Sequence, residues 1–189
     1  PDDEYIATPY ACGAPKENSA ESDSSLRFKN LPKLDDSAAA LAFKRLETYM
    51  GRKFYAVSST ELGGENTAEA LHIAAMLDLP IVDADPAGRA VPELQHSTYF
   101  LEGMPIYPLS VATNFGESII FEKVCDDFRA EEIIRSIAVA SDNEVGVADH
   151  PMNGSQYKRS TIPGMLSYAI DVGRTLRLAN GSGQLAANN

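Results

Sequence analysis

Four carboxylates that lie close together along the sequence could carry out acid–base chemistry. Asp83 and Asp85 are two residues apart in a run with strand composition, so a regular strand would point both to one face. Glu61 precedes this run and Glu93 follows it. Clustered carboxylates raise one another's pKa, which suits one of them to act as a general base near neutral pH. The alternative is turn capping, because Asp85 directly precedes a Pro-Ala-Gly turn sequence.

A glycine turn, Gly63-Gly64, follows the first of these acids. Backbone N–H groups in such a turn can point at an anion, and the dipole of a following helix adds to the attraction. The turn matches neither a dinucleotide-binding nor a Walker A motif, and Glu65 within it would repel a phosphate. The alternative is a tight strand-to-helix turn in which Asn66 or Thr67 caps the helix.

The three histidines, His72, His96 and His150, show no spacing typical of metal ligands. We therefore predict no metal site, and the sequence indicates no particular cofactor. His96 lies three residues after Glu93, where it could donate a proton to a leaving group.

The charge and hydropathy of the chain argue against several classes of partner. The 189 residues carry a formal net charge of -11, whereas nucleic-acid binding requires an excess of Lys and Arg to neutralise phosphates. No apolar run approaches the roughly 20 residues of a membrane span, and no signal-peptide pattern opens the sequence. Cys12 and Cys125 are far apart in the sequence, and two scattered thiols are typical of a protein in a reducing compartment. We predict a cytoplasmic protein that binds neither nucleic acid nor a membrane.

Alternating helices and strands should position the carboxylates. Helices are predicted at residues 37–50, 67–78, 130–141 and 162–179. Strands are predicted at residues 5–9, 54–58, 81–85, 99–101, 106–112, 118–124 and 144–148. Residues 54–85 read as a βαβ unit with parallel strands. The alternation predicts an α/β fold, a three-layer sandwich with a mostly parallel sheet and helices on both faces. One domain would fill residues 1–179, and residues 180–189 would form a polar tail or linker.

In open parallel sheets, ligands bind beyond the carboxyl ends of the strands. That rule brings the turn at residues 61–67, the strand end at residues 83–85 and the loop at residues 88–96 to one edge. The connection at residues 149–159 could reach the same ligand, or it could be a polar surface loop. Gly154, Gln156, Lys158 and Arg159 would supply amide and cationic donors to it.

Two stretches resemble the S-methyl thiohydantoin desulfurase family. Residues 61–67 and 80–95 contain E-L-G-G-E-N-T, P-I-V-D-A-D and G-R-A-V-P-E-L-Q, and residues 151–167 contain P-M-N-G-S-Q-Y-K-R and I-P-G-M-L-S. The similarity extends over residues 1–179. One departure is that Glu65 stands where the family's turn usually has a third glycine.

The resemblance implies a three-layer α/β fold and a kinship with hydantoin and oxoproline metabolism. It also implies that the chain is a fragment of a longer two-domain protein, with a β-rich domain following near residue 179 as a partner. Association with hydantoinase-type enzymes, or with further copies of the chain, is left open.

The leading hypothesis is a pocket for a hydantoin-like cyclic amide, with hydrolytic removal of a thiol from an S-methyl thiohydantoin. Carboxylate acid–base catalysis would use Asp83, Glu93 and His96. Substrate binding would use the turn, strand-end and loop residues Glu61, Gly63, Gly64, Asn66, Asp85, Gln95, Gln156, Lys158 and Arg159. The alternative is a non-catalytic subunit-interaction domain of a hydantoinase- or oxoprolinase-type assembly. A large exposed apolar patch would favour the alternative, and a closed polar pocket would favour the enzyme.

Overall fold

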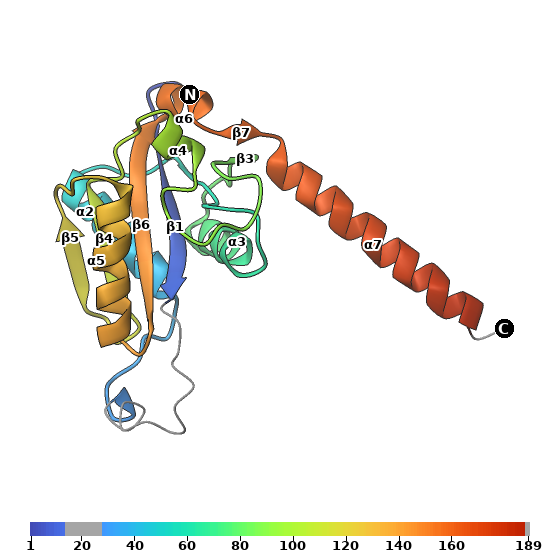
Figure 1. Ribbon diagram of the computed structural model, residues 1–189, viewed down its shortest axis with the longest axis horizontal. Coiled ribbons are helices and arrows are strands. Elements are labelled where there is room, and N and C mark those ends of the chain that lie inside the picture. The colour runs from blue at the N-terminus through green and yellow to red at the C-terminus, as the bar shows by residue number, and fades with distance from the viewer. Residues whose placement is uncertain (14–27, 188–189) are drawn as a thin grey trace.

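The fold is built on a five-stranded sheet, seen in a computed structural model that describes residues 1–13 and 28–187 (Figure 1). Its strand order is β2-β1-β6-β4-β5. The strands are β1 (Tyr5–Gly13), β2 (Ala56–Val57), β4 (Leu109–Thr113), β5 (Ser118–Phe121) and β6 (Glu144–Asn153).

The sheet is mostly antiparallel, so the expectation of a mostly parallel sheet is wrong. Only β1 and β2 pair in parallel, whereas β1–β6, β4–β6 and β4–β5 are all antiparallel. The cause is a long ladder that brings Tyr5 opposite Asn153 and Gly13 opposite Glu144. This ladder separates the parallel pair from the β4–β5 hairpin.

Only part of the predicted βαβ unit forms, because its second strand is almost absent. Its first strand is β2, and its helix is α3 (Glu65–Leu77). Its second strand contributes a single parallel bridge between Val57 and Ile81. The chain then leaves the main sheet, and β3 (Ala84–Asp85) pairs with β7 (Ile162–Pro163) in a separate two-stranded sheet.

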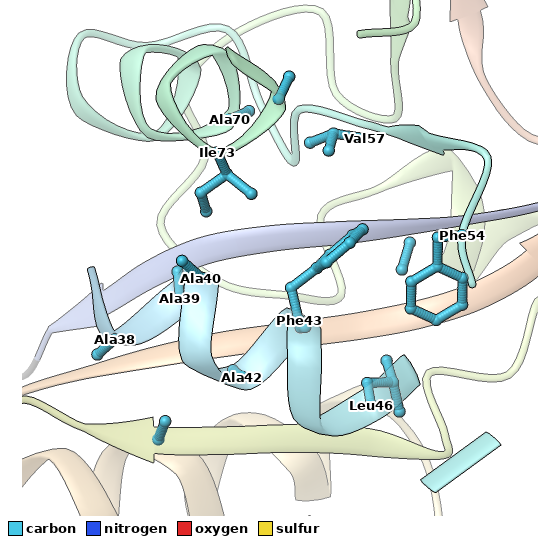
Figure 2. Packing of buried hydrophobic residues seen from close by; sticks show 14 residues of the cluster. Ala38, Ala39, Ala40, Ala42, Phe43, Leu46, Phe54, Val57, Ala70 and Ile73 are labelled. Carbon is cyan, nitrogen blue, oxygen red and sulfur yellow. The ribbon is translucent and has the colours of Figure 1, made fainter. Parts of the chain in front are cut away.

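Helices cover both faces of the main sheet, as predicted. Helices α2 (Ala38–Met50) and α3 pack on one face, where Phe43 of α2 and Ile73 of α3 belong to one cluster (Figure 2). The sheet contributes Ala112 and Ala148 to this cluster. Helix α5 (Asp127–Ala140) packs on the other face against Val111 and Val147. Neighbouring residues of one strand therefore face opposite layers, as the two-residue period of a strand requires.

Helix α2 shows how local sequence sets an element. The Ser37 hydroxyl accepts a hydrogen bond from the Ala40 N–H at 3.1 Å and begins the helix. Gly51 ends it in the left-handed conformation, with φ of 63°. Phe43 is fully buried and meets Phe54 edge to face, with ring centroids 5.0 Å apart (Figure 2).

Three further elements differ from expectation. Residues 98–101 form the short helix α4 (Thr98–Leu101) instead of a strand, because the Ser97 side chain accepts from the Phe100 N–H and caps it. Residues 149–159 are not a loop: β6 continues to Asn153, and a capping box of Asn153 and Gln156 begins α6 (Gly154–Arg159). Helix α7 (Met165–Ala187) continues through most of the expected tail.

None of the helices in the described part of the chain is long and apolar enough to cross a membrane. Cys12 is buried, Cys125 is exposed, and neither forms a disulfide.

Candidate functional site

A hollow of about 260 Å³ lies beyond the carboxyl ends of the two parallel strands, β1 and β2. Its walls come from the end of β1, from residues 60–66, from residues 91–97 and from α5. The sheet has one parallel pair, and the hollow lies where the rule for parallel strands places ligands.

Glu61 and Asn66 hold two of these walls together. The Asn66 side-chain oxygen accepts from the Ala11 N–H at 3.0 Å, and its Nδ2 donates to Glu61 Oε1 at 2.8 Å. The other Glu61 oxygen, Oε2, accepts from the Val91 N–H at 2.7 Å. Both residues line the hollow, and their hydrogen bonds connect β1, the glycine turn and the following loop. Asn66 is therefore not the N-cap of α3; that position belongs to Gly64, which offers no side-chain cap.

Arg135 and Glu131 from α5 close the opposite side. Arg135 donates through Nη1 to the Gly13 carbonyl at 2.6 Å and through Nη2 to the Pro92 carbonyl at 2.7 Å. Its Nε donates to Glu131 Oε1, and Glu131 Oε2 accepts from the Leu94 N–H at 3.3 Å. No motif around residues 131–135 marked these side chains in the sequence. Their i, i+4 spacing on a helix was the only available signal.

Of the three predicted catalytic residues, Asp83, Glu93 and His96, Glu93 is the one that lines the hollow. Its carboxylate is half exposed, accepts from Gln95 Nε2 and lies 3.9 Å from His96 Nδ1. Gln95 and His96 lie next to Glu93 but do not line the hollow. A partly exposed carboxylate with solvent access can take a proton from water.

Two uncharged groups form the rest of the polar lining near β1. Burial raises the pKa of the Cys12 thiol to about 11, and the nearby Glu131 charge adds to the shift. Burial also raises the pKa of Tyr10 well above its ordinary value, with the Asp149 charge as the next cause. Both groups therefore stay protonated at neutral pH.

Tyr10 connects the hollow to a buried charged cluster that the sequence reading missed. Its hydroxyl donates to Asp149 Oδ2 at 2.7 Å, and Asp149 Oδ1 lies 3.0 Å from His150 Nδ1. His150 Nε2 lies 3.5 Å from Asp127 Oδ2, too far for a good hydrogen bond but close enough for charge attraction. His150 is 4% exposed and has a positive φ of 44°, which is rare outside glycine.

Asp83 and Asp85 lie apart from this hollow. The Asp83 carboxylate accepts from the Ser167 N–H at 2.8 Å and from its hydroxyl at 2.7 Å, which anchors the first turn of α7. Asp85 is buried and accepts from the N–H groups of Ala87 and Gly88 at 3.1 and 2.8 Å. That is the turn-capping role which the sequence left open as the alternative.

The other predicted binding residues have structural partners or lie on the surface. Lys158 lines a second hollow of about 340 Å³ together with Asp83, and its Nζ lies 2.6 Å from Asp2 Oδ1. Gln156 belongs to the capping box of α6, and Arg159 is exposed at its end. Gly63 lies beside the hollow, where its N–H donates to Thr67 Oγ1 at 3.1 Å.

No group of three or more His, Cys, Asp and Glu side chains is arranged to hold a metal ion within residues 1–13 and 28–187.

Comparisons with known proteins identify the family. Residues 1–123 match the family model described as S-Me-THD-like, N-terminal domain, and residues 125–188 match the S-Me-THD-like, C-terminal domain. Strand β6 from the second segment lies between β1 and β4 from the first, so one sheet joins both segments.

A crystal structure of a protein from Chromobacterium violaceum is similar to this chain, with a TM-score of 0.73 and 28% sequence identity. The match covers 93% of this chain and 47% of that one, so this chain spans about half the length of its relative. No functionally curated protein matches the chain. Because the first family model alone covers more than half of the residues, the chain belongs to the S-Me-THD-like family, as its resemblance to the S-methyl thiohydantoin desulfurases indicated.

Proposed function

We propose that the hollow beyond β1 and β2 binds a small cyclic amide of the hydantoin type and removes a thiol from an S-methyl thiohydantoin by hydrolysis. The family gives a thiohydantoin-related role. The observation that supports this site is the Glu93 carboxylate, which lines a polar hollow beside residues tied down by hydrogen bonds. Rigid walls suit a ligand site, because they hold reacting groups in place.

The proposed reaction replaces a methylthio group with oxygen. Glu93 takes a proton from water as the water oxygen forms a bond to the ring carbon that bears the S-methyl group. The electron pair of the carbon–nitrogen double bond moves to the ring nitrogen. The carbon–sulfur bond then breaks, the ring carbon becomes a carbonyl as its new hydroxyl passes its proton to the ring nitrogen, and methanethiolate takes the proton held by Glu93 to leave as methanethiol. His96 Nδ1 lies 3.9 Å from Glu93 Oε2, so His96 is a positioning residue for the carboxylate that carries this proton.

The base is Glu93 and not Asp83, because the Asp83 carboxylate lies outside this hollow and accepts hydrogen bonds from Ser167. Glu61 and Asn66 act in it as positioning residues, since their side chains already bond to each other and to the backbone. Gln95 orients Glu93 through its side-chain amide.

The experiment is a turnover assay of the full chain with S-methyl thiohydantoin, read as methanethiol released. We expect Glu93→Gln to lower kcat by about 100-fold or more, the usual contribution of a general base. The matched control is Glu102→Gln, which removes the same charge from an exposed position outside the hollow. Full turnover by Glu93→Gln, or none by the unaltered chain, would contradict the proposal.

A second candidate is a subunit-interaction domain, and one observation favours it. Helix α7 extends away from the rest of the fold (Figure 1) and exposes large apolar side chains, among them Tyr168 and Leu176. Exposed apolar surface of this kind typically marks a protein interface.

A further inference from the structure

The hollow has an unequal supply of hydrogen-bond donors and acceptors. Several of its charged and amide donors already have acceptors within the protein. Asn66 Nδ2 donates to Glu61, and the N–H groups of Val91 and Leu94 donate to Glu61 and Glu131. All three guanidinium nitrogens of Arg135 donate to protein oxygens. A ligand therefore meets few cationic or amide donors.

Acceptors, in contrast, are abundant. Four carboxylates line the hollow against a single guanidinium: Glu61, Glu65, Glu93 and Glu131. Glu65 is exposed at the start of α3, and its carboxylate has no hydrogen-bond partner among the described residues. The carboxylate of Glu93 accepts only from Gln95 within this part of the chain. The carboxylates of Glu65 and Glu93 can therefore accept hydrogen bonds from a ligand.

A buried polar group also points to a ligand here. Cys12 lines the hollow, is 8% exposed, and its thiol has no hydrogen-bond partner within the described residues. Its raised pKa, about 11, keeps it neutral, so it does not add negative charge or attack as a thiolate. A neutral thiol beside carboxylates can accommodate the sulfur or the apolar edge of a ring, while the acids contact its N–H groups.

From this arrangement we infer that the hollow selects cyclic amides whose ring substituent is cationic over those whose substituent is a carboxylate. The inference rests on the proposed function and adds the charge of the substrate to it. Ring N–H groups would donate to Glu93, and a positive substituent would lie toward Glu65. A carboxylate substituent would meet repulsion from four carboxylates against the single guanidinium of Arg135, three of whose five N–H groups already donate to protein oxygens.

Electrostatics gives the expected size of the effect. Two unit charges about 4 Å apart in water interact by an amount equivalent to about a fivefold change in affinity. The surrounding chain has a formal net charge of -11, which adds attraction for cations at low ionic strength. Screening by salt should weaken the preference, since the mouth of the hollow is open to solvent.

The test measures binding of three hydantoins by calorimetry, with the full chain at low and high salt. The three differ only in the substituent on the ring carbon: aminopropyl, propyl or carboxyethyl. We expect affinity to fall in that order, by about fivefold or more per step. Glu65→Gln should reduce the ratio between the aminopropyl and carboxyethyl compounds by about 25-fold, which is about fivefold for each charged compound, whereas the control Glu102→Gln should preserve it.

The outcomes separate this inference from the proposed function. Equal affinities for all three compounds, or a ratio unchanged in Glu65→Gln, would overturn the charge preference while leaving a hydantoin site in place. Tighter binding of the carboxyethyl compound would also overturn it. Failure of all three compounds to bind would overturn the proposed function and this inference together.

Discussion

His150 is the most constrained residue beside the candidate site. Its imidazole is buried between the carboxylates of Asp149 and Asp127, and the Tyr99 ring lies 4.6 Å from it. Burial opposes the charged imidazole, but attraction to Asp149 and contacts with both acids outweigh it, so the pKa of His150 rises to about 9. His150 has a positive φ, a backbone conformation that costs free energy, so the contacts around the residue must hold it in place.

This cluster should make stability depend on pH. The pKa of His150 is higher in the folded protein than the ordinary value of 6.5, so its contribution is complete below the unfolded pKa and is lost as pH rises through about 9. We expect the difference in unfolding free energy between the unaltered chain and His150→Gln to shrink from about pH 6 to about pH 10, by on the order of 3 kcal/mol. Urea unfolding at several pH values measures it.

The control for that measurement is His72→Gln. His72 is half exposed and lies 3.0 Å from Asp36, so solvent screens its interaction. Its difference from the unaltered chain should stay small at every pH. A His150→Gln difference that is constant with pH would mean that the imidazole is not charged in the fold.

The site residues divide according to how far apart they lie in the sequence. Glu61, Asn66 and Glu93 were predicted because they lie in a turn and a loop that each follow a predicted strand. Arg135 and Glu131 were missed, because only the packing of α5 against the far end of β1 brings them to the hollow. Side chains from a distant helix leave no spacing signal in a single sequence.

At the scale of elements, the contact between α2 and β6 depends on one glycine. A Cβ added to Gly146 would lie 2.0 Å from the Ala39 nitrogen and 2.1 Å from the Ala38 carbon. Both are backbone atoms, so the helix itself would have to move. Alanines at the start of α2 and glycine at this point of β6 let the two backbones approach closely.

Gly146→Ala should therefore destabilise the protein by about 3 kcal/mol or more, the upper range for overpacking of a tight core. The matched control is Gly64→Ala, since Gly64 has a helical φ of -72° and no atom within 4 Å of the added Cβ. That control should be neutral or slightly stabilising. Denaturant unfolding of both variants measures the effect, and equal midpoints would show that α2 can shift without cost.

Helix α2 was predicted correctly because its start and stop signals, Ser37 and Gly51, are local. The predicted direction of the sheet was wrong because it is decided by the pairing of β1 with β6, whose partners Tyr5 and Asn153 lie far apart in the sequence. Alternating helices and strands are typical of parallel sheets, but among the described strands of the main sheet only β1 and β2 pair in parallel, with one further parallel bridge between Val57 and Ile81.

At the scale of the whole molecule, α7 differs from the layered body. It is joined to the body at its first turn, where Asp83 accepts hydrogen bonds from Ser167 and where Leu166 is buried. Farther along, Tyr168 is 63% exposed and Leu176 is 59% exposed. A helix without tertiary contacts is only marginally stable in water, so this element should either open easily or gain protection from a partner.

Hydrogen exchange at two protein concentrations separates these cases and tests the interaction-domain candidate. In dilute solution we expect amides of α7 beyond its first two turns to exchange fastest, and those of β1 and β6 slowest, because buried ladders open only on global unfolding. If α7 forms an interface between copies of the chain, its protection should rise with protein concentration, and Leu176→Glu should abolish the rise without accelerating exchange in β6. Protection of α7 equal to that of β6 in dilute solution would contradict the prediction, because it would require contacts within a single chain that hold the helix against the body.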